Sequence, residues 1–234
     1  MPEITPSPPV RAFIAALLLV LGYALSVAAR TGLADVYAEE AKSYLQTKRE
    51  AGELLTRDEW QALYGSLIRA LALAPGDPEN LSELGRLHRI VLEADDLDAA
   101  EISRYGDAGA RYYQAALALR PTWPWDWGNL ALVKYQQYQD TGGVYQDALV
   151  RAVEFGPREP PLQDRVAELG ASSWWALKAA AALAVLTAAD RALERDPQSF
   201  SRMSDAKERW RPLCTRAGDS LAHIKRHCEM LGLT

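Results

Sequence analysis

Two cysteines and two histidines near the C-terminus could form a disulfide or bind a metal. Cys214 and Cys228 are the only cysteines of the chain, and His223 and His227 lie between them. Thiolate and imidazole are zinc ligands, but His227 and Cys228 are adjacent and point in different directions on a helix, which suits a tetrahedral site poorly. We expect a disulfide, which is typical of an even pair of cysteines in an exported chain. Two buried free thiols are the alternative.

The tryptophans include the side chains best suited to contact a partner. Three of the seven lie within five residues, at Trp123, Trp125 and Trp127. Aromatic side chains often dominate the binding energy of a protein interface, and flat indole rings can also serve as stacking platforms for a glycan. We expect Trp127 to be a buried packing residue. Trp123 and Trp125 are the candidates for contact with a protein or a polysaccharide.

Residue patterns typical of catalysis are absent from the sequence. There is no phosphate-binding loop, no Gly-x-Ser-x-Gly, no His-Glu-x-x-His and no Cys-x-x-Cys. The acidic residues between positions 93 and 101 lack the spacing of a calcium-binding loop, so we expect a solvated face there. The remaining histidine, His88, falls at an expected packing position. The sequence therefore predicts a protein that is not an enzyme and that needs no cofactor or metal.

The elements that position these residues are expected to be helices, which makes the fold class all-α. Good helix formers dominate the composition, and runs of β-branched residues are nearly absent. With 49% hydrophobic and 24% charged residues, the chain can bury a core. The formal net charge is −5, with basic and acidic residues interleaved. No basic stripe is present, which argues against nucleic acid as a partner.

Residues 1–30 are predicted to form an N-terminal tail and a transmembrane helix. Four prolines among residues 2–9 predict that no helix forms there. An uncharged run then begins at Ala12 and ends at Ala29; as a helix it would be roughly 27 Å long, close to the ~30 Å of a bilayer core. We expect this run to contact the lipid bilayer as an uncleaved signal anchor. A cleavable signal peptide is the alternative, although the run is longer than is usual for one.

Four segments of the chain end in the same way. Each has an alanine five residues before a proline and a branched aliphatic residue four before it. The prolines lie at positions 75, 121, 157 and 197, so they are 46, 36 and 40 residues apart. The alanines are Ala70, Ala116, Ala152 and Ala192. Each ending predicts a helix whose small alanine lets a neighbouring helix approach closely and whose proline stops the helix.

The residues after the first two prolines also share a pattern. Residues 81–88 read Leu-x-x-Leu-Gly-x-x-His, and Trp127, Leu130 and Ala131 follow the same spacing. The small residue, Gly85 or Ala131, is expected where this first helix meets the second. The match weakens after position 157 and is poor after position 197.

On these patterns, residues 58–197 resemble the tetratricopeptide repeat family, whose ideal repeat is roughly 34 residues long. The resemblance implies an α-solenoid of about three irregular helix pairs, with insertions such as residues 93–109. Residues 31–57 are expected to form a linker or capping helix. Residues 198–234 are expected to form two capping helices, one from Phe200 to Trp210 and one from Leu213 to Leu231. We expect the apolar residues 174–189 to be a buried helix rather than a second membrane span.

The stretch from Ala115 to Tyr135, together with one membrane segment and a few irregular repeats, is similar to VpsP-type proteins of bacterial exopolysaccharide biosynthesis clusters. That resemblance implies an accessory role in making or exporting a surface polysaccharide, and it brings no catalytic residues with it. It implies a single-pass protein of the bacterial inner membrane. Positive charges after the apolar run mildly favour a cytoplasmic domain. We nevertheless expect a periplasmic domain, because a disulfide forms on the oxidising side.

The expected function is a scaffold that binds membrane-associated protein partners. The surface lined by first-helix residues would accept a segment of a partner, and the membrane helix would raise the effective concentration near it. The alternatives are a fixed structural subunit of a multi-protein membrane complex and a periplasmic glycan-binding module. Besides Trp123 and Trp125, the candidate binding residues are Leu81, Glu83, Arg86, Asn129, Val133 and Gln136.

Overall fold

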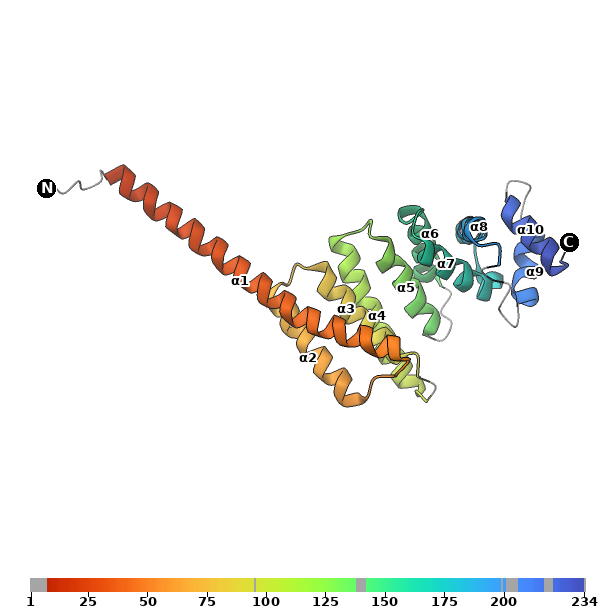
Figure 1. Cartoon of the computed structure of the whole chain (residues 1–234), viewed down its shortest axis with the longest axis horizontal. Coiled ribbons are helices and arrows are strands. Elements are labelled where there is room, and N and C mark those ends of the chain that lie inside the picture. Colours follow the sequence, from red (N-terminus) through yellow and green to blue (C-terminus); the bar gives the residue numbers. More distant parts are fainter. Residues whose placement is uncertain are drawn as a thin grey trace. The chain divides into compact units, whose positions relative to one another are not determined.

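The chain is helical throughout the part that the structure describes. The computed structural model describes residues 8–94, 96–137, 142–198, 200, 206–216 and 221–233. These residues contain helices and turns but no strand, as the composition predicts. The helices are α1 (Pro8–Ala51), α2 (Arg57–Leu73), α3 (Pro78–Val91), α4 (Ala99–Leu119), α5 (Pro124–Gln136), α6 (Gly143–Phe155), α7 (Pro160–Ser172), the 3-10 turn η1 (Trp174–Ala176), α8 (Ala179–Arg195), α9 (Ala206–Arg216) and α10 (Ala222–Leu231) (Figure 1). They form two compact units, which divide between Asn80 and Leu81.

The first unit contains the helical hairpin of α1 and α2 (Figure 1). Residues 8–33 of α1 are exposed, and the helix then buries Ala34, Ala38, Ala41 and Leu45. These four residues recur every three or four positions, so they form one stripe of the helix. Within the described residues, α1 alone is long and apolar enough to cross a membrane, a property it shares with signal sequences.

The start of α1 corrects one expectation from the sequence. The helix begins at Pro8 and includes Pro9, whereas the prolines predicted no helix before residue 10. Both prolines lie in the first turn, where a backbone N–H has no partner within the helix and a fixed φ favours helix initiation. Residues 1–7 lie outside the described part.

Polar contacts close the turn between α1 and α2. Thr56 accepts a hydrogen bond from the backbone N–H of Glu59, and Glu59 accepts one from the backbone N–H of Thr56, which makes a capping box. The Glu59 carboxylate also accepts from the Tyr44 hydroxyl and pairs with Lys48 at 2.9 Å. These contacts, led by the Tyr44 hydroxyl, lower the pKa of Glu59 to about 2.

The four shared sequence endings become four equivalent helix ends. In α2, α4, α6 and α8 the residue after the helix donates its backbone N–H to the carbonyl of the repeated alanine. Those alanines, Ala70, Ala116, Ala152 and Ala192, are all fully buried. Three residues after the first three prolines, α3, α5 and α7 begin at Pro78, Pro124 and Pro160. Proline at the first helical position lets each new helix start directly after the turn.

Small residues let the helices of the second unit pack closely. A Cβ added to Gly85 of α3 would lie 3.0 Å from the Tyr113 ring of α4, so this position meets the next helix as the sequence predicted. A Cβ on Gly170 of α7 would overlap Val185 of α8 at 2.1 Å. Extensive contacts join α4 with α5, α5 with α6, and α7 with α8, while α5 also contacts α7 and α6 contacts α8. One continuous apolar core results.

The interruption between α3 and α4 is shorter than predicted. The expected insertion covered residues 93–109, but α4 already begins at Ala99. Asp98 caps it, because its carboxylate accepts from the backbone N–H of Glu101 while Glu101 binds back to the N–H of Asp98. Part of the acidic cluster therefore has a structural role. Asp95 lies outside the described residues.

The C-terminal helices have different boundaries from those expected. A break was predicted between Trp210 and Leu213, yet α9 runs from Ala206 through Pro212 to Arg216, and α10 is confined to Ala222–Leu231. A disulfide joins Cys214 of α9 to Cys228 of α10, with a Cα–Cα distance of 5.8 Å. The rings of Phe200, Trp210 and His227 pack against one another, with the Trp210 and His227 rings 4.7 Å apart.

Candidate partner-binding surface

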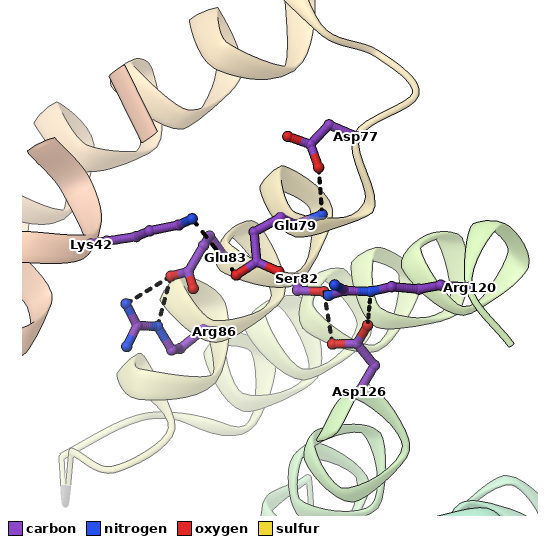
Figure 2. Close-up of polar contacts among 8 residues, drawn as sticks. All are labelled: Lys42, Asp77, Glu79, Ser82, Glu83, Arg86, Arg120 and Asp126. Atoms are coloured by element: carbon purple, nitrogen blue, oxygen red, sulfur yellow. Dashed lines mark hydrogen bonds and ion pairs between the residues drawn. The ribbon is translucent and has the colours of Figure 1, made fainter. Parts of the chain in front are cut away.

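The candidate surface lies on the second unit, on the helices α3, α5, α7 and α9. On α3, Glu83 and Arg86 are both half-buried and form an ion pair at 2.7 Å. Figure 2 shows the two side chains meeting on the same helix, because residues three apart are neighbours on a helical surface. The ion pair fixes the guanidinium and carboxylate at a surface where a partner can contact them.

Two of the expected binding residues belong to the core instead. Leu81 is buried, and Val133 is fully buried. A Cβ added to Gly109 of α4 would lie 3.3 Å from Val133, which shows that this side chain fills the contact between α5 and α4. The first-helix pattern placed both residues on the binding face, but apolar side chains gain more by packing against the second helix. We therefore exclude them from the surface.

The remaining expected residues of α5 lie at the edge of the core. Asn129 is half-buried and accepts a hydrogen bond from Arg165 of α7 at 2.8 Å. Gln136 is half-buried too, and its side-chain oxygen has no hydrogen-bond partner. The Gln136 oxygen itself is buried, so only the rest of this side chain is open to a partner.

A chain of side-chain hydrogen bonds connects the successive helices of this surface. Ser82 of α3 donates to Asp126 of α5 at 2.7 Å, Arg165 of α7 donates to Asn129 of α5, and Arg209 of α9 donates to Ser172 of α7. Each contact joins residues between 36 and 44 positions apart in the sequence. We call these residues the polar row. Its hydrogen bonds join each of these helices to the next.

A three-residue network surrounds the Asp126 carboxylate. The Asp126 carboxylate, almost fully buried, pairs with Arg120 at 3.0 Å and accepts from Ser82. Arg120 also donates to the Ser82 hydroxyl at 2.6 Å. Figure 2 shows the guanidinium of Arg120 and the hydroxyl of Ser82 converging on this carboxylate. The network joins α3, the end of α4 and the start of α5. No local sequence pattern marks these three residues as partners.

Figure 2 also draws contacts that belong to the first unit. Lys42 of α1 lies 3.6 Å from the Glu79 carboxylate, and the Asp77 side chain accepts from the backbone N–H of Glu79. The second contact satisfies a donor at the start of α3, as helix N-termini require.

The three clustered tryptophans have three different environments. Trp123 is 43% exposed, and the Arg120 guanidinium lies over its ring at 4.9 Å. Trp125 is half-buried and packs against the apolar core. Trp127 is half-buried as well, and its indole N–H donates to the carbonyl of Pro121 at 2.7 Å. Of the two tryptophans expected to contact a partner, Trp123 has the larger open face.

Burial changes the acid–base properties of several side chains of the second unit. Desolvation, with a smaller contribution from Asp164, raises the pKa of Glu168 on α7. Desolvation lowers the pKa of His88, whose Nδ1 bonds the carbonyl of Leu84. It likewise lowers the pKa of His227.

This surface carries charged, amide and aromatic side chains. Paired guanidinium and carboxylate groups, amides and one open indole can recognise a polypeptide. Within the described residues, no three histidine, cysteine or acidic side chains come together as a metal site would require. Cys214 and Cys228 are joined to each other, and His223 contacts Arg226.

Comparison with known proteins adds no family to this description. No family model matches the chain, and no curated protein matches it.

Proposed function

We propose that this protein is a membrane-anchored scaffold of the tetratricopeptide type, and that it binds protein partners without catalysis. The observation that carries the proposal is the fourfold recurrence of one helix end. Each of α2, α4, α6 and α8 closes on a buried alanine before a proline, and a new helix follows the first three prolines after the same interval. Recurring helix pairs of this kind stack into an extended surface suited to binding a polypeptide segment.

The apolar part of α1 supports attachment to a membrane. Its most apolar stretch is entirely unburied and has a mean hydropathy of 2.4, so it is suited to a bilayer and not to a protein core. In this proposal the helix is an uncleaved anchor in the bacterial inner membrane. The disulfide between α9 and α10 supports a periplasmic location for the second unit. The polysaccharide pathway is proposed on the resemblance to VpsP-type proteins.

The binding surface is tested by site-specific photo-crosslinking in cells. A photoreactive amino acid placed at Arg86, Asn129 or Gln136 of the full-length protein should capture one partner. The same amino acid at Gln114, which is exposed on α4 outside the polar row, is the matched control. Equal capture from both sets, or capture from neither, would contradict a binding surface on α3 and α5.

The competing function is that of a fixed structural subunit, and it predicts a different behaviour when the protein is purified alone. A scaffold should remain monodisperse in mild detergent without its partner, because its own core is complete. A subunit that is permanently buried in a complex should aggregate when purified alone, since its exposed apolar surface would lack a cover.

Trp123 favours a second candidate, the glycan-binding module. Its indole is 43% exposed and is backed by Arg120, so it offers a flat platform with a cation behind it. Titration with oligosaccharide should change tryptophan emission if this function is correct, and Trp123→Ala should abolish the change.

A further inference from the structure

The turn between α7 and α8 presents an indole to solvent. Trp175 lies in the 3-10 turn η1 and is 79% exposed, which makes it the most exposed large apolar side chain of the described residues. Burying an indole removes a large apolar area from water. In this turn that area stays in contact with water.

Buried polar side chains from α6 hold this turn in place. The Gln146 side chain accepts from the backbone N–H of Lys178 at 2.8 Å and donates to the carbonyl of Ala176 at 3.2 Å. The Tyr145 hydroxyl and the Ser173 hydroxyl are hydrogen-bonded at 2.8 Å. All three side chains, Tyr145, Gln146 and Ser173, are buried. The exposure of Trp175 is thus fixed by the fold and does not reflect a loose loop.

The residues that follow add an exposed apolar side chain and an exposed cation to this indole. Leu183 of α8 is 63% exposed, and Lys178 is exposed at the start of the helix. Lys178 is the only charged residue between positions 174 and 189, and no acidic residue occurs there. The opposite face of α8, including Ala181, Val185 and Ala188, is buried in the core. This burial favours a core helix over a second membrane span.

We propose that Trp175, Lys178 and Leu183 form a contact surface for the headgroup region of an anionic phospholipid bilayer. Tryptophan and lysine are the side chains that favour the membrane–water interface, because each combines an apolar body with a polar or charged tip. The single positive charge complements an anionic headgroup, and so does the positive end of the α8 dipole.

The proposal rests on the membrane attachment of α1. Two apolar side chains and one cation bind a bilayer only weakly by themselves. Attachment through α1 ties the chain to a bilayer and so raises the effective concentration of lipid around the rest of the protein.

The test uses the full-length protein in vesicles that contain phosphatidylcholine, anionic phosphatidylglycerol and a lipid with brominated acyl chains. All the tryptophans of the chain lie outside α1, so quenching by bromine reports contact of the rest of the chain with the bilayer. We expect quenching in the wild type and at least about a twofold smaller effect in Trp175→Phe. The matched control Trp123→Phe, which removes another exposed indole, should retain the wild-type quenching.

Lipid charge provides the second arm of the experiment. Quenching should be stronger with phosphatidylglycerol than in pure phosphatidylcholine, and Lys178→Gln should remove that difference. Equal quenching of wild type and Trp175→Phe, or the absence of quenching, would overturn the proposal.

Flotation of the same vesicles distinguishes the absence of the lipid contact from the absence of the membrane anchor. Vesicles that carry the protein without quenching would overturn the lipid contact alone and leave the anchor intact. A protein that does not float with the vesicles would overturn both. A change of oligomeric state in Trp175→Phe, with no quenching, would assign the surface to a second copy of the chain and reject the lipid contact.

Discussion

At the scale of single residues, Asp126 illustrates how a buried charge is retained. Removing a carboxylate from water is costly, and the attraction to one partner rarely offsets the cost fully. Here Arg120 and Ser82 both bind the carboxylate and also bind each other. Because the three residues come from α3, the end of α4 and α5, the network specifies how these elements meet as well as stabilising them.

Replacing Asp126 with alanine should lower the free energy of unfolding by about 2–3 kcal/mol, because the Arg120 guanidinium and the Ser82 hydroxyl both lose the carboxylate that they bind. Asp147→Ala is the matched control, since that carboxylate is 59% exposed and 3.7 Å from Arg151; it should change stability by less than about 0.5 kcal/mol. Urea unfolding followed by tryptophan emission measures both. An equal loss of unfolding free energy in the two variants would show that the network does not stabilise the fold.

His227 should make the C-terminal cap sensitive to acid. Burial lowers the pKa of His227 below its unfolded value, so the folded state favours the neutral ring. Its contribution to stability is complete above the unfolded pKa of about 6.5 and is lost as the pH falls toward the lower folded pKa. The melting temperature should therefore drop as the pH falls below about 6.5 toward about 5. His227→Phe should show a smaller drop; an unchanged drop would assign the acid sensitivity elsewhere.

At the scale of elements, the repeated alanine is where the sequence is most informative. Ala70, Ala116, Ala152 and Ala192 are fully buried, and each accepts the last backbone hydrogen bond of its helix. A larger side chain there would push the neighbouring helix away, because packed interiors have no spare volume.

Ala116→Leu should therefore destabilise the second unit by about 1–3 kcal/mol through overpacking. Ala115→Leu is an ideal control, since the neighbouring residue is exposed and lies in the same helix. Thermal unfolding should distinguish the two variants clearly. A similar melting temperature for both would mean that the site can expand.

The elements also show how far sequence reasoning extends. Local rules predicted the helix class, the helix ends at four prolines, the exposed apolar run and the small residue at Gly85. They failed where a local signal had more than one outcome. Pro8 starts a helix, although the prolines of that stretch were expected to exclude one. The helix α9 runs through Pro212, where a break between two helices was expected. They placed Val133 on the surface because the pattern did not include Gly109 of α4, which the side chain contacts.

Local sequence patterns could not predict the contacts between residues far apart in the chain. Ser82 and Asp126 are 44 positions apart, and Gln146 binds a turn more than 30 positions later. Nothing in the sequence around either residue marks it as paired. The exposed Trp175 was missed for the same reason, since its neighbours read as one buried apolar helix.

At the scale of the whole molecule, the disulfide links stability to location. Cys214 and Cys228 close a loop across a separation of 14 residues, which corresponds to about 3 kcal/mol of stabilisation in the chain-entropy description. In intact spheroplasts, a membrane-impermeant maleimide should label the protein only after reduction. Labelling without reduction would exclude the disulfide in cells. Labelling only after lysis and reduction would place the second unit in the cytoplasm.

The unbroken course of α1 has a geometric consequence for the first unit. The helix passes from its exposed apolar part directly into the stripe that packs against α2. Each residue of a helix rotates by about 100° and advances by about 1.5 Å. The number of residues between Ala29 and Ala34 therefore sets the direction in which the hairpin points around the axis of α1. Deleting one residue there would turn the hairpin by about 100°, whereas inserting seven would lift it by roughly 10 Å with almost no rotation.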